Sequence, residues 1–168
     1  MTKIATTKSM LSAVLLSDAR SLVADFNYAQ VDLKEASNTT VKLGQVVYYN
    51  GTDAYRILKN TDFTSDTVLT APSGTPSLPD RGAIGIVVGF NGSIGGEYEA
   101  TVGTTATKAF VLFRGPVGVK DEHAFGGLVF DSGISAPARK ALIKSQLEGK
   151  GIDVKPVTAQ VTSSLYGF

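Results

Sequence analysis

The sequence predicts a mainly β protein, a β-rich α+β domain with one helix in its C-terminal half. Three observations support this fold class. Apolar and polar residues alternate with a period of two over several stretches, which is typical of half-buried strands. Glycine accounts for 18 of the 168 residues, above the usual share of ~7%, and therefore predicts many turns. Only residues 138–148 carry a clear helical pattern in this half of the chain.

Two Asn-Gly turns organise the predicted strands. Asn50-Gly51 separates two β-rich runs and predicts a hairpin, because both residues tolerate positive φ. The turn at residues 91–96 predicts a second hairpin between residues 84–90 and 98–102. Ala109–Phe113 is the most hydrophobic run and is expected to be central, with Gly115-Pro116 breaking it. The predicted strands are Val31–Leu33, Val41–Leu43, Val46–Tyr49, Tyr55–Leu58, Ile84–Phe90, Tyr98–Val102, Ala109–Phe113 and Val117–Val119.

Residues 60–81 lack periodicity and contain three prolines, so we expect a long surface loop there. The helix is predicted over Ala138–Glu148, with Ser135 as the N-cap and Pro137 in the first turn. Gly149 or Gly151 should end it. The alternation resumes at Ile152 and Val154, which predicts an edge strand.

The N-terminal segment carries an isolated apolar stripe. Its members recur at helical spacings of three, four and seven: Leu11, Val14, Leu15, Leu22 and Phe26. The stripe fits both a docked helix and a partner-binding arm. We therefore divide the chain into an N-terminal arm over residues 1–36, with partial helix as one option, and a β-rich domain over residues 37–168. No small-x-small cleavage site follows the apolar run, so we do not expect a cleaved signal peptide.

The composition excludes several classes of function. Lys and Arg number 16 and Asp and Glu number 15, a near balance that argues against binding to nucleic acid. The chain has no cysteine and one histidine, which disfavours disulfide scaffolds, thiol nucleophiles and His-rich metal sites. No stretch approaches the ~20 apolar residues of a membrane span. His123, between acidic neighbours and loop residues, is interpreted as a solvated surface residue. We therefore expect no enzyme activity, metal or cofactor, and interpret the chain as a structural or interaction module.

A family resemblance rests on three stretches of sequence. The first is Phe26-Asn27-Tyr28, then Val31-Asp32-Leu33 and residues 41–47, and the second is Ala83–Val87. The third is residues 109–119, followed by the helix and the ending Gly151-Ile152-Asp153-Val154. In this order the chain resembles the lambda-type head decoration, or capsid cement, proteins of tailed phages over residues 25–155. It differs from small family members in its longer segment before Phe26 and in the additional loop at residues 60–81.

The resemblance implies a small β-barrel, β-tulip-like in form, with an extended N-terminal arm. It further implies a homotrimer on the exterior of an expanded virion capsid, made in the host bacterial cytoplasm, with the arm pairing with strands of the major capsid protein. The candidate capsid contacts are Leu11, Leu15, Leu22, Phe26, Tyr28 and Val31. Two other functions compete with this one. They are another virion β-protein, such as a head-fibre base or tail component, and a small hydrolase, which the residue inventory disfavours most.

Overall fold

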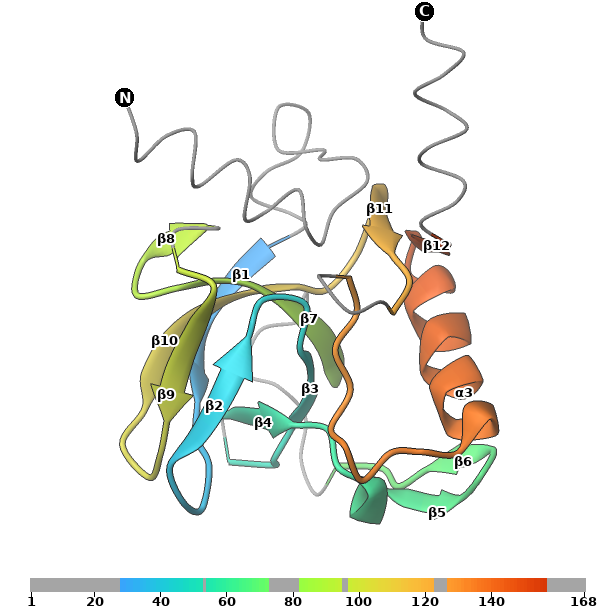
Figure 1. Cartoon of the computed structure of the whole chain (residues 1–168), viewed down its shortest axis with the longest axis horizontal. Helices are drawn as coiled ribbons and strands as arrows, with labels where there is room; N and C mark the ends of the chain where they lie inside the picture. Colours follow the sequence, from blue (N-terminus) through green and yellow to red (C-terminus); the bar gives the residue numbers. More distant parts are fainter. Residues whose placement is uncertain (1–27, 53, 73–81, 95–96, 123–126, 157–168) are drawn as a thin grey trace, which may run out of the picture.

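A closed five-stranded β-barrel forms the centre of the molecule (Figure 1). The computed structural model describes residues 28–52, 54–72, 82–94, 97–122 and 127–156. The barrel consists of β1 (Tyr28–Leu33), β4 (Tyr55–Ile57), β3 (Val46–Tyr49), β7 (Ile84–Phe90) and β10 (Thr107–Leu112). Its strand order is β10-β1-β4-β3-β7, and β7 pairs back onto β10 to close the ring. The predicted mainly β fold with a barrel is confirmed.

Three smaller units surround the barrel. β2 (Thr39–Lys42) and β9 (Glu99–Val102) form an antiparallel ribbon on one side of the barrel, and β5 (Phe63–Ser65) pairs with β6 (Val68–Leu69) below helix α3 (Figure 1). β11 (Val117–Lys120) and β12 (Ile152–Lys155) pair in parallel, joined by a connection that contains α3 (Pro137–Glu148). The remaining elements are β8 (Ser93–Ile94) and the 3₁₀ turn η1 (Asn60–Asp62).

The core fills the barrel and continues beneath helix α3. Its largest fully buried side chains come from the barrel strands, from residues just after β2 and β4, from the segment before the helix and from α3 and β12. They are Tyr55, Phe90, Leu33, Leu43, Leu58, Ile84, Ile86, Leu112, Ile134, Ile143, Leu147 and Ile152. The rings of Tyr49, Tyr55 and Phe113 stack in sequence with centroids 5.3 Å apart at each step. These tyrosines therefore pack against neighbouring strands, as expected for a hairpin, and are not exposed to a ligand.

The boundary predicted for the arm, at residue 36, is wrong. β1 begins at Tyr28 and pairs with β10 along its whole length, from Tyr28 opposite Leu112 to Leu33 opposite Thr107. The alternation that predicted a strand only from Val31 misses the start of β1, because its buried positions, Tyr28, Val31 and Leu33, do not keep strict period two. The β domain therefore includes residues 28–36.

One predicted hairpin is confirmed and the other is wrong. β3 and β4 pair on either side of Asn50-Gly51, with Tyr49 opposite Tyr55 and Gly51 at a φ of 87°. Asn91-Gly92, with φ values of 49° and 81°, forms a two-residue turn from β7 to the short β8. The strand predicted at 98–102 exists, but β9 pairs with β2 because β7 already has neighbours on both edges.

Residues 60–69 form η1 and the β5–β6 hairpin, so this part of the predicted long surface loop has regular secondary structure. Phe63 is buried here at 8% exposure. Residues 73–81, with Pro76 and Pro79, lie outside the described residues.

The helix and the final strand match the predicted positions. α3 starts at Pro137 with Ala136 as its N-cap and no capping side chain, so the assignment of Ser135 as the cap is wrong. Proline suits the first helical turn because its missing N–H is not needed there. Ile143 and Leu147 are the buried residues of the helix. β12 confirms the predicted edge strand, and Gly151 (φ 81°) precedes it, packed against the backbone of Gly115.

We predict that Gly85→Ala destabilises the barrel by roughly 1–3 kcal/mol. A Cβ at this position would lie 2.3 Å from Val111 Cγ1 and 2.8 Å from Phe113 Cε1, and both side chains are fixed in the core. Urea unfolding followed by circular dichroism measures the change. Gly149→Ala is the matched control, since its Cβ would make only ordinary contacts at 3.5 Å and its φ is −60°. Equal stability of the Gly85 variant and the wild type would contradict the packing described.

Candidate functional site

The predicted capsid contacts divide into two groups. Leu11, Leu15, Leu22 and Phe26 lie outside the described residues. Tyr28 and Val31 lie in β1 with 8% and 3% exposure, and both belong to the core. Neither of these side chains is therefore available on the surface of the described domain as the predicted contact, because β1 is a barrel strand that packs both of them inside.

No arrangement typical of a metal centre is found in the described ranges, where no three His, Cys, Asp or Glu side chains are grouped to hold an ion. His123 lies outside these ranges. Its predicted acidic neighbours, Asp121 and Glu122, instead pair with lysines of α3. None of the described helices has the length and apolarity needed to cross a membrane.

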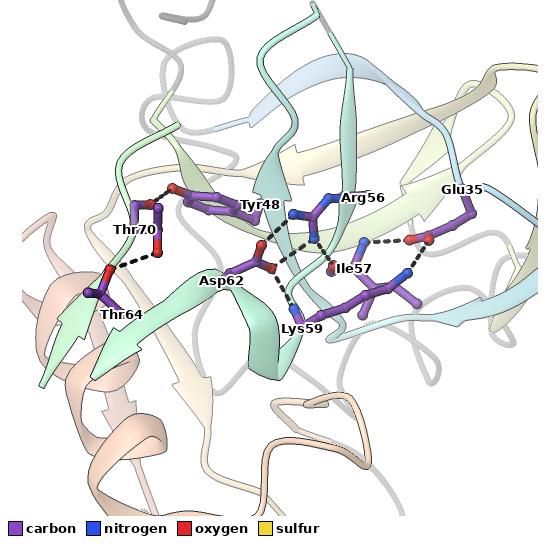
Figure 2. Close-up of polar contacts among 8 residues, drawn as sticks. All are labelled: Glu35, Tyr48, Arg56, Ile57, Lys59, Asp62, Thr64 and Thr70. Carbon is purple, nitrogen blue, oxygen red and sulfur yellow. Dashed lines mark hydrogen bonds and ion pairs between the residues drawn. The ribbon is translucent and has the colours of Figure 1, made fainter. Parts of the chain in front are cut away.

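The most extensive polar cluster lies beside β4 and is built around a buried carboxylate (Figure 2). Asp62, whose side chain is 7% exposed, accepts hydrogen bonds from both terminal nitrogens of Arg56, the Nη1 bond to Oδ2 measuring 2.8 Å. It also accepts the backbone N–H of Lys59 at 2.7 Å. The hydrogen bonds to Asp62 raise the pKa of Arg56; burial opposes this rise and the negative charge of Asp62 adds to it. This carboxylate is therefore fully partnered and fixes η1 against β4.

Glu35 provides a second buried anchor on the far side of β4 (Figure 2). Its side chain is 1% exposed. Oε1 accepts the N–H of Ile57 at 2.7 Å, and Oε2 accepts Lys59 Nζ at 2.9 Å. The Ile57 N–H is thereby bonded at the end of a three-residue strand, so Glu35 extends the pairing where β4 stops.

Tyr48 and Thr70 connect this cluster to the end of the β5–β6 hairpin. The hydroxyl of Tyr48 donates to the carbonyl of Thr70, while Thr70 N–H donates to the carbonyl of Asp62 at 2.7 Å. Burial raises the pKa of Tyr48, the charge of Asp62 adds to the rise, and Arg56 opposes it. The phenol therefore stays protonated at neutral pH and acts as a hydrogen-bond donor.

Helix α3 holds the same hairpin from its other side. Arg139 Nε donates to Asp66 Oδ1 at 2.8 Å, and Nη1 donates to the carbonyl of Asn60 at 3.1 Å. The guanidinium also lies over the ring of Phe63, 5.2 Å from its centroid. One cation thus connects the helix to η1, β5 and the turn between β5 and β6.

We name Glu35, Tyr48, Arg56, Lys59, Asp62 and Arg139 the polar latch. Both carboxylates of the latch accept hydrogen bonds from cations and backbone N–H groups, an arrangement typical of structural ion pairs. Sequence reasoning missed it, because the contacts join residues of four separate segments. The only signal in the sequence was the pair of opposite charges Arg56 and Asp62, six residues apart across the end of β4. Such a spacing does not by itself predict that the two side chains are in contact. The arrangement stabilises the fold by holding η1 and the β5–β6 hairpin against β4 and α3.

A second ionic cluster fixes the end of β11 to the helix. Lys144 Nζ lies 2.5 Å from Asp121 Oδ1, and Lys140 Nζ lies 2.9 Å from Glu122 Oε2. Burial alone would raise the pKa of Asp121, but the hydrogen bond from Lys144, the backbone N–H of Glu122 and the two lysine charges lower it overall. The cations of α3 are therefore engaged within the molecule.

The described surface offers few apolar contacts to a partner. Its exposed large hydrophobic residues are Val68, at 50% exposure, and Tyr98, at 36%. The β2–β9 ribbon presents polar and charged side chains, with Thr40, Lys42, Glu99 and Thr101 all exposed. Binding through the described domain would therefore depend on backbone pairing and polar groups.

Comparison with known proteins identifies no relative: no family model, no curated protein and no solved structure matches the chain.

We predict that Asp62→Ala lowers the free energy of unfolding by roughly 3 kcal/mol, because it leaves a half-buried guanidinium and the Lys59 N–H without their acceptor. Thermal and urea unfolding measure the loss. The control is Lys108→Ala, which removes an ion pair to Asp32 whose lysine is 60% exposed and should cost less than about 1 kcal/mol. Equal losses in the two variants would show that the latch contributes no more than a surface pair.

We predict that Lys144→Gln raises the pKa of Asp121, because burial then acts with less opposition. In the wild type, the pKa of Asp121 in the folded protein lies below its ordinary value of 3.8. The ionised carboxylate therefore stabilises the fold above pH 3.8, and this stabilisation is lost as the pH falls through the folded pKa. Carboxyl NMR titration measures both pKa values. Lys108→Gln, remote from the cluster, should leave the titration of Asp121 unchanged. An unshifted pKa in the Lys144 variant would contradict this pairing.

Proposed function

We propose that this chain is a structural virion protein that binds the outer surface of an expanded phage capsid and stabilises it. The observation that carries the proposal is the distribution of apolar side chains. The described domain begins with a barrel strand at Tyr28 and exposes few large hydrophobic residues, whereas Leu11, Leu15, Leu22 and Phe26 all precede that strand. An apolar segment attached to a closed, polar-surfaced barrel is suited to binding a partner.

The order of elements supports the same proposal. The family resemblance depended on a central strand, a second strand after Gly115-Pro116, a helix and a final Gly-Ile-x-Val strand. In the fold these are β10, β11, α3 and β12, and the last strand pairs with β11.

The binding mode follows from the charge of the chain. A net charge of +1 gives little long-range attraction, so affinity must come from short-range contacts. An extended arm can add to an exposed edge of a sheet in the major capsid protein and bury apolar side chains in alternate pockets. Three copies on one capsid site, as the family resemblance implies, would convert weak single contacts into firm attachment.

Deleting residues 1–25 should leave a folded barrel and abolish binding to expanded heads. β1 and every later element are retained, whereas three of the four apolar candidates are removed. Each is worth roughly 1.5–3 kcal/mol if fully buried, so the combined loss should exceed a hundredfold in affinity. Co-sedimentation with purified heads and electron microscopy measure occupancy, and circular dichroism checks the fold.

The full chain with Leu11, Leu15, Leu22 and Phe26 changed to Ser should behave like the truncated chain. Val68→Ser is the matched control, because it removes an exposed apolar side chain of the described domain and should leave binding unchanged. Unchanged decoration by the truncated chain would overturn the arm as the contact. Absence of wild-type binding to any expanded head would overturn the proposed function and favour another virion or non-virion role.

A further inference from the structure

The two Asn-Gly turns differ in how firmly their asparagine side chains are held. Asn50 and Asn91 are the two asparagines of the chain that precede a glycine. This dipeptide is chemically labile, because a glycine has no side chain to keep its backbone nitrogen away from the preceding asparagine amide. The amide can then be lost without an enzyme. How fast this happens depends on the freedom of the asparagine side chain in the fold.

The side chain of Asn50 is fixed by its own turn. Its Oδ1 accepts hydrogen bonds from the backbone N–H of Thr52 at 2.8 Å and from the Thr52 hydroxyl at 2.9 Å. The backbone N–H of Asn50 donates to the carbonyl of Ala54 at 2.9 Å, and Asn50 is half-buried at the turn between the barrel strands β3 and β4. Rotation of this amide therefore breaks both bonds to Thr52.

The side chain of Asn91 is held much less firmly. Among the described residues it makes one hydrogen bond, from Nδ2 to Glu97 Oε2 at 3.2 Å, and both partners are exposed. Gly92 is exposed too, and a Cβ built on it would meet no atom within 4 Å. The turn leads to β8, which lies at the outer edge of the sheet (Figure 1). The amide can therefore rotate without disturbing the barrel.

We propose that Asn91 is a site of spontaneous deamidation in the folded protein and that its bonds to Thr52 protect Asn50. The backbone nitrogen of Gly92 gives its proton to solvent base and attacks Cγ of Asn91. The Cγ–Nδ2 bond breaks, the leaving nitrogen takes up a proton, and ammonia departs from a cyclic succinimide. Water then opens the ring at one of its two carbonyl carbons, which gives aspartate or isoaspartate. The net reaction is hydrolysis of one amide, with water consumed and ammonia released.

Deamidation reverses the local electrostatics of the turn. The amide that donates to Glu97 becomes a carboxylate, so an attractive contact is replaced by two neighbouring negative charges. At pH 7 the formal net charge of the chain falls from +1 to zero. The modified turn is therefore expected to separate from Glu97.

The barrel should tolerate this change. β7 is paired with β3 on one side and with β10 on another, and Phe90, directly before the turn, is fully buried. Isoaspartate adds one methylene group to the main chain, which alters the register of β8 alone, a strand of two residues. The product should therefore keep its fold. If the chain is a virion protein, as proposed above, copies are not replaced after assembly and the modification accumulates with the age of the particle.

Peptide mass spectrometry of the aged full-length chain tests the proposal. The folded protein is incubated at mildly alkaline pH in water labelled with heavy oxygen, and a second sample is incubated in concentrated urea. Opening of each succinimide incorporates one labelled oxygen, which separates this conversion from any that occurs later, during digestion in ordinary water. Fragmentation distinguishes isoaspartate from aspartate. The urea sample is the matched reference, because both asparagines precede glycine and neither is held by a fold there.

We expect Asn91 to convert several-fold faster than Asn50 in the folded chain, with isoaspartate among its products, and at a comparable rate in urea. Thr52→Ala should raise the rate at Asn50 several-fold and leave Asn91 unchanged, because it removes the hydroxyl bond to Oδ1. Gly92→Ala should slow conversion of Asn91, since its methyl group obstructs the attack.

Equal rates at the two sites of the folded chain would overturn the proposal, as would faster conversion of Asn50 or an Asn91 product without isoaspartate. An unchanged rate at Asn50 in the Thr52 variant would overturn the protection. The reaction is measured on the free chain, so bare heads in the binding assay overturn the proposed function alone, and a stable Asn91 overturns this inference alone.

Discussion

Closure of the barrel by β10 is the constraint on which the other parts of the structure depend. β10 pairs with β1 along six residues and with β7 on its other edge, where the register shifts between Phe110 and Val111. A bulge of this kind bends a strand and lets a small sheet meet itself. Two of the three outer units are attached to the closing strands: β2 follows β1, β9 precedes β10, and β11 follows β10 through Gly115. The ribbon and the helical unit are therefore held by the same ring of hydrogen bonds.

The polar latch connects the barrel to the helix by a different kind of contact. Two buried carboxylates, Glu35 and Asp62, each accept both a backbone N–H and a cation. Such groups are costly to bury, and the full set of partners offsets that cost. Arg139 reaches the same region from α3, so the β5–β6 hairpin is held from two sides. The consequence is that charged residues near this hairpin are committed to stability and are poor candidates for chemistry.

Local signals in the sequence predicted individual elements well, and contacts between distant segments were predicted poorly. Asn50-Gly51 located a hairpin, and Ala138–Glu148 located the helix to within one residue. The partner of β9 could not be predicted, since alternation in residues 98–102 identifies a strand without saying which strand lies beside it. The latch was missed for the same reason. Tyr28 and Val31 were expected as capsid contacts because the family resemblance implied an entry arm there, and the sequence does not show that β10 takes this segment as its barrel partner. In contrast, once the pairing of β2 with β9 is known, the alternation of residues along each strand predicts which ribbon side chains are exposed.

The proposed contact through the segment before Tyr28 has a physical basis in what the described surface offers. A chain with balanced charges and few exposed apolar residues in its described domain has two ways to bind: apolar side chains in the segment before Tyr28, and unpaired backbone groups at strand edges. Open edges pair with many sequences, which is why soluble proteins protect them with lysine and other charges. Here Lys42 lies on one edge and Glu99 on the other. Each of these charges disfavours pairing with an apolar or like-charged strand, so both edges of the ribbon are protected against indiscriminate association.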